Sequence, residues 1–328
     1  MIHSRDISVV IQGPIEWTMD REHGVGVTIA LSRQIRRLLP DAEIILSTWK
    51  GQKRDAIEYD TLIESKDPGP QGAWPSFTVN NVNRQIVSTA VGLKAVTRRY
   101  VLKIRSDMVL RSTRFLDIFE GTEPLPVNER NVFARAVLTN NFSSRDTAAI
   151  LKRLPGHPLP FHFSDHVSFG LREDVQFLWD VPAQGDADSI FFMDRSQPNR
   201  FRLHELARLT PEQYIFTSAL AKKVPVEIEH YADNRPHIIE QSEYYMTTHI
   251  VTVPDREFSI YFEKYHTDHH FSFEWMRRNP DQELLETHMR PPAAPPGPSW
   301  LPKPLRAITA PMREPKRIKD RMARLFSA

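Results

Sequence analysis

Apolar runs of strand length alternate with helical patterns through the first 110 residues of this 328-residue chain. The strand-like runs cover residues 7–14, 42–49, 60–65 and 99–110, and the helical patterns cover 31–39 and 83–96. Continuous apolar runs suit strands that are buried on both faces of a parallel sheet, and the helical patterns supply its crossover connections. The order strand, helix, strand, helix, strand predicts an α/β protein with a doubly wound sheet.

The middle of the chain is more mixed. Further strands are expected over 131–138 and 164–171, and a short helix over 172–180. Residues 209–223 have clear helix-start signals, because Thr210 can cap the helix and Gln213 completes a capping box. Residues 226–290 are rich in histidine and aromatic residues, and their pattern indicates no definite element.

Proline marks a change of character near the C-terminus. Nine of the 26 prolines fall within 291–315, which predicts an extended linker. After it, residues 316–326 form a basic amphipathic pattern. Such a helix can lie on an anionic membrane surface, here the inner membrane, or it can dock on its own domain or fray.

Composition excludes several classes of protein. A net charge of +2, from 43 basic and 41 acidic residues, argues against a general nucleic-acid binder. The absence of cysteine rules out disulfides, thiolate metal sites and a cysteine nucleophile. The start of the sequence has no signal-peptide pattern, and no apolar run approaches 18 residues. We therefore expect a soluble, cytoplasmic protein.

A charged trio, Arg105, Ser106 and Asp107, interrupts the apolar run over 99–110. In doubly wound sheets, ligands bind in the crevice beyond the carboxyl ends of the strands. Gln12 and Gly13 close the first strand in the same way. Both polar strand ends are therefore expected to face one crevice, where Gln12 and Gly13 either contact a nucleotide or form an ordinary turn.

Three roles are open to Asp107. It can be a structural carboxylate that pairs with Arg105 or Lys103, it can be a general base, or it can bind a divalent cation such as Mg²⁺ or Mn²⁺. The preceding helix presents Asn83, Arg84 and Gln85 in its first turn, where anions bind readily. An arginine at a helix start and an aspartate at the end of the next strand suit a nucleotide diphosphate bridged by a metal.

This layout resembles that of nucleotide-sugar-dependent glycosyltransferases of the GT-A type. Those enzymes have an "ARN"-like helix start, followed by a strand that ends in a DxD motif holding the metal and the diphosphate. Here "NRQ" (83–85) and "RSD" (105–107) stand at those places. The chain resembles more specifically the WavE lipopolysaccharide-synthesis family, over roughly residues 5–270. The similar blocks are "ISVVIQGPI" (7–15), "AEIILSTWKGQ" (42–52), "NNVNRQIVSTAVGLK" (80–94) and "LKIRSDMVL" (102–110).

The resemblance implies a GT-A-like doubly wound mixed sheet flanked by helices, with a Pro-rich C-terminal tail. Residues 1–290 would form the transferase domain, with a nucleotide-binding half at 1–122 and an acceptor-binding half at 123–290, before the tail at 291–328. The implied donor-site residues are Gln12, Gly13, Asn83, Arg84, Arg105 and Ser106. Asp107 would be the metal ligand for Mn²⁺ or Mg²⁺.

The sequence departs from the DxD pattern because Arg105 stands in place of the first carboxylate. Asp107 can still hold a cation if phosphates and water complete the shell. Alternatively, Arg105 itself neutralises the diphosphate, and the metal requirement is weak or absent.

Two carboxylates are candidates for the base that deprotonates the acceptor hydroxyl. Within "HFSDHVSFG" (162–170), Asp165 comes just before a probable strand and a glycine, where we expect a substrate-facing loop to expose it, with His166 as a structural or hydrogen-bonding neighbour. Glu212 lies in the first turn of the helix over 209–223. Each can instead be purely structural, as a turn residue or as a partner of the helix dipole.

Other side chains give weaker signals. His249, His266, His269 and His270 could include an extra metal or diphosphate ligand, although their spacing matches no common zinc site. Trp49 and Trp74 could stack on a base or a sugar but are more typical of a core.

The function implied is transfer of a sugar from a nucleotide-sugar donor to a glycan or lipid-linked glycan, such as a lipopolysaccharide core or another cell-surface polysaccharide. Two alternatives remain open: a sugar nucleotidyltransferase, whose glycine-rich signature and lysine are missing after the first strand, and a non-catalytic scaffold on a degenerate transferase fold.

Overall fold

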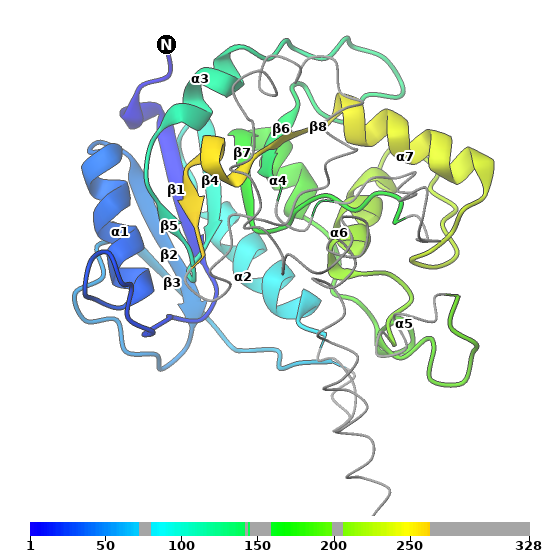
Figure 1. Cartoon of the computed structure of the whole chain (residues 1–328), viewed down its shortest axis with the longest axis horizontal. Coiled ribbons are helices and arrows are strands. Elements are labelled where there is room, and N and C mark those ends of the chain that lie inside the picture. Colours follow the sequence, from blue (N-terminus) through cyan, green and yellow to red (C-terminus); the bar gives the residue numbers. More distant parts are fainter. Residues whose placement is uncertain (72–79, 142–143, 145–158, 199–205, 263–328) are drawn as a thin grey trace, which may run out of the picture.

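The computed structural model describes residues 1–71, 80–141, 144, 159–198 and 206–262. In these residues a seven-stranded sheet has the order β3-β2-β1-β4-β7-β6-β8, and a two-stranded sheet pairs β5 with β9 (Figure 1). The strands are β1 (Ile7–Gln12), β2 (Glu43–Trp49), β3 (Thr61–Ser65), β4 (Tyr100–Arg105), β5 (Val109–Leu110), β6 (Val137–Asn140), β7 (Val167–Leu171), β8 (Ile250–Val253) and β9 (Ile260–Tyr261).

The large sheet is mixed. Strands β3, β2, β1 and β4 are parallel, β7 is antiparallel to both of its neighbours β4 and β6, and β8 is parallel to β6. The predicted α/β class, with a doubly wound mixed sheet flanked by helices, is confirmed. Because β7 runs backwards, its first residue lies beside the ends of β4 and β6. We call this side of the sheet, where β1 to β4 end, the carboxyl edge.

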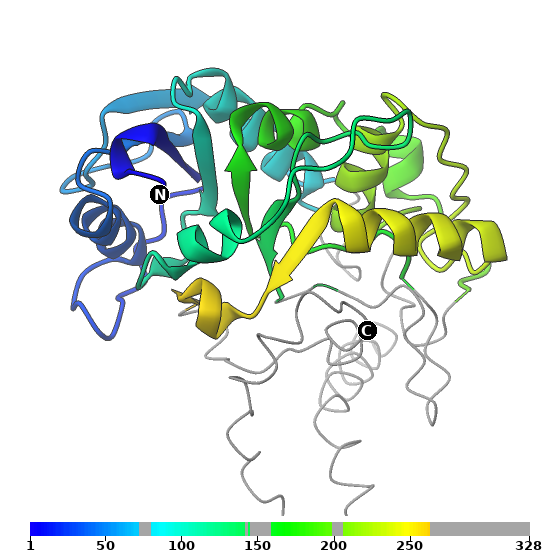
Figure 2. The ribbon, with the colours of Figure 1, turned by 90° about the horizontal axis from the view of Figure 1, so that it is seen from above.

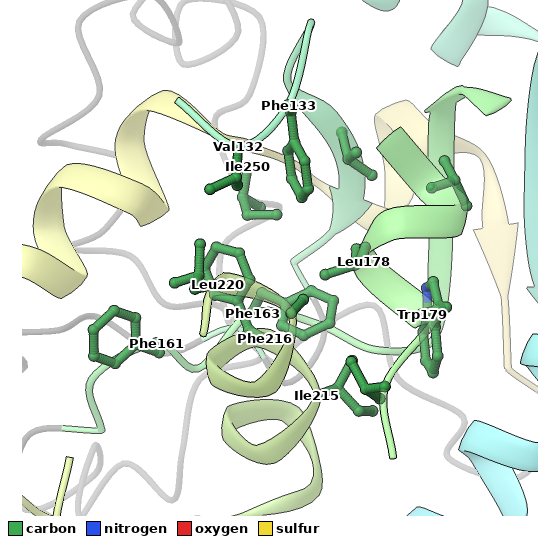
Figure 3. Close-up of a cluster of buried hydrophobic side chains, with 14 of the residues drawn as sticks. Val132, Phe133, Phe161, Phe163, Leu178, Trp179, Ile215, Phe216, Leu220 and Ile250 are labelled. Atoms are coloured by element: carbon green, nitrogen blue, oxygen red, sulfur yellow. The ribbon is translucent and has the colours of Figure 1, made fainter. Parts of the chain in front are cut away.

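Helices cover both faces of the sheet (Figure 2). They are α1 (Val27–Leu38), α2 (Val82–Lys94), α3 (Arg114–Glu120), α4 (Arg172–Trp179), α5 (Asp186–Ser189), α6 (Pro211–Leu220), α7 (Pro236–Thr248) and α8 (Asp255–Phe258), with a 3₁₀ turn at Ser4–Asp6. One hydrophobic cluster joins α2, α4 and α6 to one face, and a second joins α1 and α3 to the other. Figure 3 shows part of the first cluster, including Phe163, Trp179 and Phe216.

The close approach of α2 to the sheet requires a glycine. A Cβ atom on Gly92 would lie 2.6 Å from Cγ1 of Val10 and 2.9 Å from Cβ of Ser47. The Ser47 hydroxyl also donates a hydrogen bond of 2.6 Å to the carbonyl of Ser88. These contacts set the helix directly on β1 and β2, and its first turn lies at the carboxyl edge.

The capping box of α6 is present as predicted. The Thr210 hydroxyl accepts from the backbone N–H of Gln213 at 3.3 Å, and the Gln213 side chain accepts from the backbone N–H of Thr210 at 3.1 Å. The Gln213 amide nitrogen also donates to the carbonyls of Pro160 and Tyr231, each at 2.8 Å. This one side chain therefore ties α6 to the segment that leads to β7.

Several predicted boundaries were wrong. The run over 99–110 is not one strand, because β4 ends at Arg105 and the following strand, β5, pairs with β9 in the small sheet. Next to β5, the N–H of Arg111 donates to the carbonyl of Ser259 at 2.7 Å. The strand predicted at 131–138 is β6 at Val137–Asn140. Helix α7 and strand β8 were not predicted. The Pro-rich tail and the basic pattern over 316–326 lie outside the described residues.

Candidate functional site

A cavity of about 370 Å³ opens at the carboxyl edge, beside the ends of β1 and β4 and the first turns of α2. It is lined by Gln12, Gly13, Pro14, Glu16, Trp49, Asn81, Arg84, Gln85, Ser88, Arg105, Ser106 and Asp107. Gln12 and Arg105 face each other in the register of β1 and β4. The prediction that these two polar strand ends share one crevice is confirmed.

The floor of the cavity is held by backbone contacts between the two strand ends. Gly13 has φ 116°, a conformation that favours glycine, and a Cβ atom there would lie 3.0 Å from the hydroxyl oxygen of Ser106. Ser106 is buried; its N–H donates to the carbonyl of Gln12 at 2.9 Å, and its carbonyl accepts from the Thr28 hydroxyl at 2.9 Å. The backbone between Arg105 and Asp107 is therefore fixed at its midpoint.

Two arginines line the cavity, and each is held side-on by a carboxylate. Arg84 donates from Nε and Nη2 to the two oxygens of Asp67, at 2.8 Å and 2.6 Å, and from Nη1 to the Asn81 side chain at 3.1 Å. Arg105 donates from Nε and Nη2 to the two oxygens of Asp107, at 2.9 Å and 2.6 Å. Hydrogen bonding to Arg84 lowers the pKa of Asp67, and the same contact raises the pKa of Arg84.

Among the described residues, the groups around Asp107 do not by themselves make up a ligand set for a resident divalent cation. Both oxygens of Asp107 accept from Arg105, and the Asp107 side chain is 16 % exposed. The other carboxylate of the cavity lining is Glu16, and one of its oxygens accepts two hydrogen bonds from Thr18. Within the described part of the chain, no group of three or more His, Cys, Asp or Glu side chains could hold a metal ion. Of the three roles open to Asp107, the structure supports the pair with Arg105.

A buried charge lies behind the cavity, two residues earlier on β4. Lys103 is fully buried, and its ammonium donates to the carbonyl of Asp165 and, at 3.3 Å, to the carbonyl of His166. The nitrogen also lies 4.0 Å from the ring centroid of Trp179, which Figure 3 labels. Burial lowers the pKa of Lys103 to about 7, although the negative charge of Asp165 opposes the shift. No functional role for Lys103 was predicted, although a charged residue within an apolar run was the available signal.

The two candidate bases are close enough to interact electrostatically. Asp165 is 2 % exposed, so the expectation that its loop would expose it was wrong. The segment is buried because the flanking Phe161 and Phe163 pack into the hydrophobic cluster of α4 and α6. Burial, and secondly the charge of Glu212, raise the pKa of Asp165 to about 6. The Glu212 side chain is 14 % exposed, and one of its oxygens lies 3.4 Å from Nε2 of His162.

Gln85 connects this carboxylate pair to the cavity. The Gln85 side chain lines the cavity, and its interaction with the Asp165 carboxylate opposes the rise in the pKa of that group. Its oxygen Oε1 is buried and has no hydrogen-bond partner in the described residues. A buried acceptor of this kind indicates a place for a ligand hydroxyl, an N–H group or a water.

The remaining predicted residues divide between the cavity and the core. Gln12 lines the cavity, where its side-chain oxygen accepts from the Ser88 hydroxyl at 2.7 Å, and Trp49 lines it too. Asn83 does not line it, because its side-chain amide is paired with the backbone of Gln184.

The histidine candidates also divide. His166 packs its ring against that of Phe262 at a centroid distance of 4.9 Å. His249 is buried where α7 meets β8, the outermost strand on the far side of the sheet from β3. Its Nε2 accepts a hydrogen bond from Val132 N–H at 3.1 Å. His249 is therefore not a ligand at this site. Trp74, His266, His269 and His270 lie outside the described residues.

Comparison with known proteins gives one family match. The model of a family described as WavE lipopolysaccharide synthesis matches residues 7–279. No curated protein matches the chain. In the part of the chain that the structure describes, none of the helices has the length and apolar character needed to cross a membrane.

Three solved structures are distantly similar. A 4-diphosphocytidyl-2C-methyl-D-erythritol synthase from Anaerococcus prevotii is 13 % identical, with a TM-score of 0.34, over 74 % of this chain and 99 % of that one. A cytidylyltransferase from Leptospira borgpetersenii is 9 % identical, with a TM-score of 0.32, over 55 % and 66 %. A putative glucose-1-phosphate thymidylyltransferase from Bacillus anthracis is 9 % identical, with a TM-score of 0.32, over 54 % and 76 %. These resemblances are too distant to support an argument about function.

Proposed function

Because the chain belongs to the WavE family of lipopolysaccharide synthesis, we propose that it is a nucleotide-sugar-dependent glycosyltransferase that works in the cytoplasm. Its acceptor would be a lipopolysaccharide core or another cell-surface polysaccharide. The observation that most supports this function is the convergence of Arg84 and Arg105 on one cavity at the carboxyl edge. Paired guanidinium groups are well suited to the oxygens of a diphosphate.

In this proposal the cavity holds the nucleotide donor. Gln12 and the backbone at Gly13 contact the nucleoside, and Arg84 and Arg105 contact the diphosphate. The cavity volume of about 370 Å³ is within the range of small-molecule sites. The buried oxygen of Gln85 would accept a hydrogen bond from a hydroxyl of the bound sugar or of the acceptor.

The transfer step needs a proton acceptor and a place for negative charge. A new bond forms between the acceptor oxygen and the anomeric carbon, while the bond from that carbon to phosphate oxygen breaks and its electron pair leaves with the diphosphate. Arg84 and Arg105 stabilise the charge that develops on the leaving group. The acceptor's proton passes to the pair Asp165 and Glu212, whose more exposed member is Glu212. A carboxyl pKa raised to about 6 brings the base close to neutral pH.

A screen of nucleotide donors tests the proposal. UDP-, GDP- and CMP-sugars are incubated with the protein, with and without lipopolysaccharide core oligosaccharides, and the released nucleotide is identified. Consumption of one donor with release of its nucleoside phosphate supports glycosyl transfer. Release of pyrophosphate from a nucleoside triphosphate and a sugar 1-phosphate would instead indicate a nucleotidyltransferase, and absence of any nucleotide binding would indicate a scaffold.

Once a donor is found, the carboxylate pair is tested with Asp165→Asn and Glu212→Gln. We expect the transfer rate to fall about 100-fold or more in at least one variant, because a general base contributes roughly that much. In the wild type the rate should fall as the pH drops through about 6, where Asp165 becomes protonated. Glu240→Gln, an exposed change on α7, is the matched control and should leave both measurements unchanged. Full activity in both test variants would remove the pair from the mechanism.

A further inference from the structure

The Arg105–Asp107 pair stands where a metal-binding DxD motif would have two carboxylates. A pair of aspartates that holds a divalent cation is neutral overall, since two negative charges meet a charge of +2. Arg105 and Asp107 reach the same neutral sum with no cation, because one guanidinium faces one carboxylate. Residue 105, which would be a metal-ligating aspartate in a DxD motif, is an arginine and therefore carries a positive charge itself.

The geometry of the pair leaves little room for a cation between its members. Nε and Nη2 of Arg105 contact different oxygens of Asp107, at 2.9 Å and 2.6 Å. A metal that used Asp107 would have to displace a guanidinium from a two-point, charge-assisted contact that is mostly shielded from water. The five donors of a guanidinium, by contrast, let one arginine serve a carboxylate and a phosphate together.

The backbone favours the paired arrangement. Ser106, between the two residues, is fixed by its contacts with Gln12 and Thr28. The Ser106 hydroxyl also donates to the carbonyl of Pro14. With their connecting residue held at three points, Arg105 and Asp107 have few ways to separate other than by changes of side-chain rotamer.

The same arrangement recurs across the cavity. Arg84 meets Asp67 through the same two nitrogens, at 2.8 Å and 2.6 Å. Two arginines thus enter one cavity from different elements, α2 and β4, each oriented by its own carboxylate. Such orientation reduces the entropy lost when a guanidinium closes on a phosphate.

We propose that Arg105, oriented by Asp107, replaces a divalent cation at the donor's diphosphate, so that this protein binds its nucleotide without a metal. The inference rests on the proposed function, since it assigns a role within the donor site. Asp107 is then a positioning residue that acts through Arg105.

Calorimetry with UDP, GDP and CDP tests the inference on the full-length protein. Each nucleotide is titrated in EDTA, in Mn²⁺ and in Mg²⁺. We expect one nucleotide to bind with an affinity that changes less than about twofold between these conditions, because the guanidinium groups are always present. Electron paramagnetic resonance with Mn²⁺ alone should detect no ion bound at the cavity.

An exchange of charge gives the sharpest form of the test. Arg105→Asp creates a pair of carboxylates two residues apart, so nucleotide affinity in EDTA should fall about tenfold or more. Added Mn²⁺ should then restore binding in the variant, although it has no effect on the wild type. Asp107→Asn should weaken binding several-fold while leaving it insensitive to EDTA, because Arg105 keeps its charge but loses its orienting partner.

Arg36→Gln is the matched control, because Arg36 forms a comparable ion pair with Asp60 at 2.7 Å and does not line the cavity. It should leave nucleotide affinity unchanged, and thermal unfolding of every variant shows whether the fold is intact.

The outcomes distinguish the inference of metal-free nucleotide binding from the proposed glycosyltransferase function. Binding that requires Mn²⁺ or Mg²⁺ in the wild type and is lost in Asp107→Asn would overturn the inference while supporting the proposed function. Failure of all three nucleotides to bind under any condition would overturn both. Binding in EDTA that Arg105→Asp leaves unaltered would show that Arg105 does not contact the diphosphate, and would also overturn the inference.

Discussion

Strand β4 presents two basic side chains, Lys103 and Arg105, on one face, and each interacts with a carboxylate in a different environment. Arg105 and Asp107 lie at the cavity, partly exposed and paired through their side chains. Lys103, two residues earlier and on the same face of the strand, is fully buried and interacts with Asp165, which is also buried. Burial moves the pKa values of Lys103 and Asp165 toward neutrality. The comparison contrasts a pair at the cavity, proposed above to bind the diphosphate, with a buried carboxylate whose pKa of about 6 suits the proton acceptor proposed above.

The largest expected effect comes from removing the buried cation. Lys103→Met should lower the free energy of unfolding by about 3–5 kcal/mol, because it removes the cation whose charge stabilises the buried Asp165 carboxylate. Urea denaturation measures this loss. Above the pKa of Asp165 the loss should be larger than below it, since a protonated carboxyl needs no cation.

Two further variants sharpen this result. Lys103→Met combined with Asp165→Asn should recover part of the lost stability, because the uncompensated charge is gone. Arg105→Met should lower the free energy of unfolding by less than Lys103→Met does, because the side chains of Arg105 and Asp107 keep 20 % and 16 % exposure whereas Lys103 is fully buried. If Lys103→Met and Arg105→Met cost the same, burial does not distinguish the two pairs.

A smaller effect is expected at His249, where burial acts without an ion pair. Burial lowers the pKa of His249 to about 4 from 6.5. Between these pH values the unfolded chain binds a proton that the folded protein does not, so stability decreases as the pH falls through this range. The contribution lost by the end of the range is about 3 kcal/mol.

The measurement compares unfolding free energies of the wild type and His249→Gln at about pH 7 and about pH 4.5. Glutamine can accept the hydrogen bond from Val132 N–H that His249 now accepts, but it has no proton to gain. The wild type should therefore lose more stability than the variant on acidification. Equal losses would mean that His249 is accessible to protons in the folded protein.

The smallest effect is expected at Asp67, whose pair with Arg84 is about one-third exposed, at 35 % and 34 % for the two side chains. Asp67→Asn should lower the free energy of unfolding by no more than about 1 kcal/mol, because water screens such pairs. Nucleotide affinity should fall more clearly than stability, since Arg84 loses its orientation. If Asp67→Asn lowered the free energy of unfolding more than Lys103→Met does, the expectation that a buried charge matters more than an exposed ion pair would be wrong.

The sequence was most informative where function and local structure coincide. Gln12, Gly13, Arg84 and Arg105 were predicted at one crevice because polar residues followed buried strands or opened a helix, and these residues line the cavity. The capping box of Thr210 and Gln213 was predicted in the same way and is confirmed. Each of these inferences depends on residues close together in the chain.

Prediction failed where contacts between distant segments decide the outcome. Asp165 was expected in an exposed loop, but the packing of Phe161 and Phe163 buries that segment. The antiparallel direction of β7 brings Asp165 beside β4, and no local pattern shows a strand's direction. The break after Arg105 depends on pairing with β9, about 150 residues later, and loop-mediated pairings of this kind have no local signal.

The sequence by itself determined the α/β class, the strand ends that carry polar residues and the charge of each candidate group, because periodicity and composition are local properties. Tertiary structure decided which charges meet. It paired Arg105 with Asp107 and Arg84 with Asp67, and it buried Lys103 against Asp165. The reason is that a charge's partner and its exposure to water depend on the whole packed sheet, and these two quantities set both its pKa and the ligand it can bind.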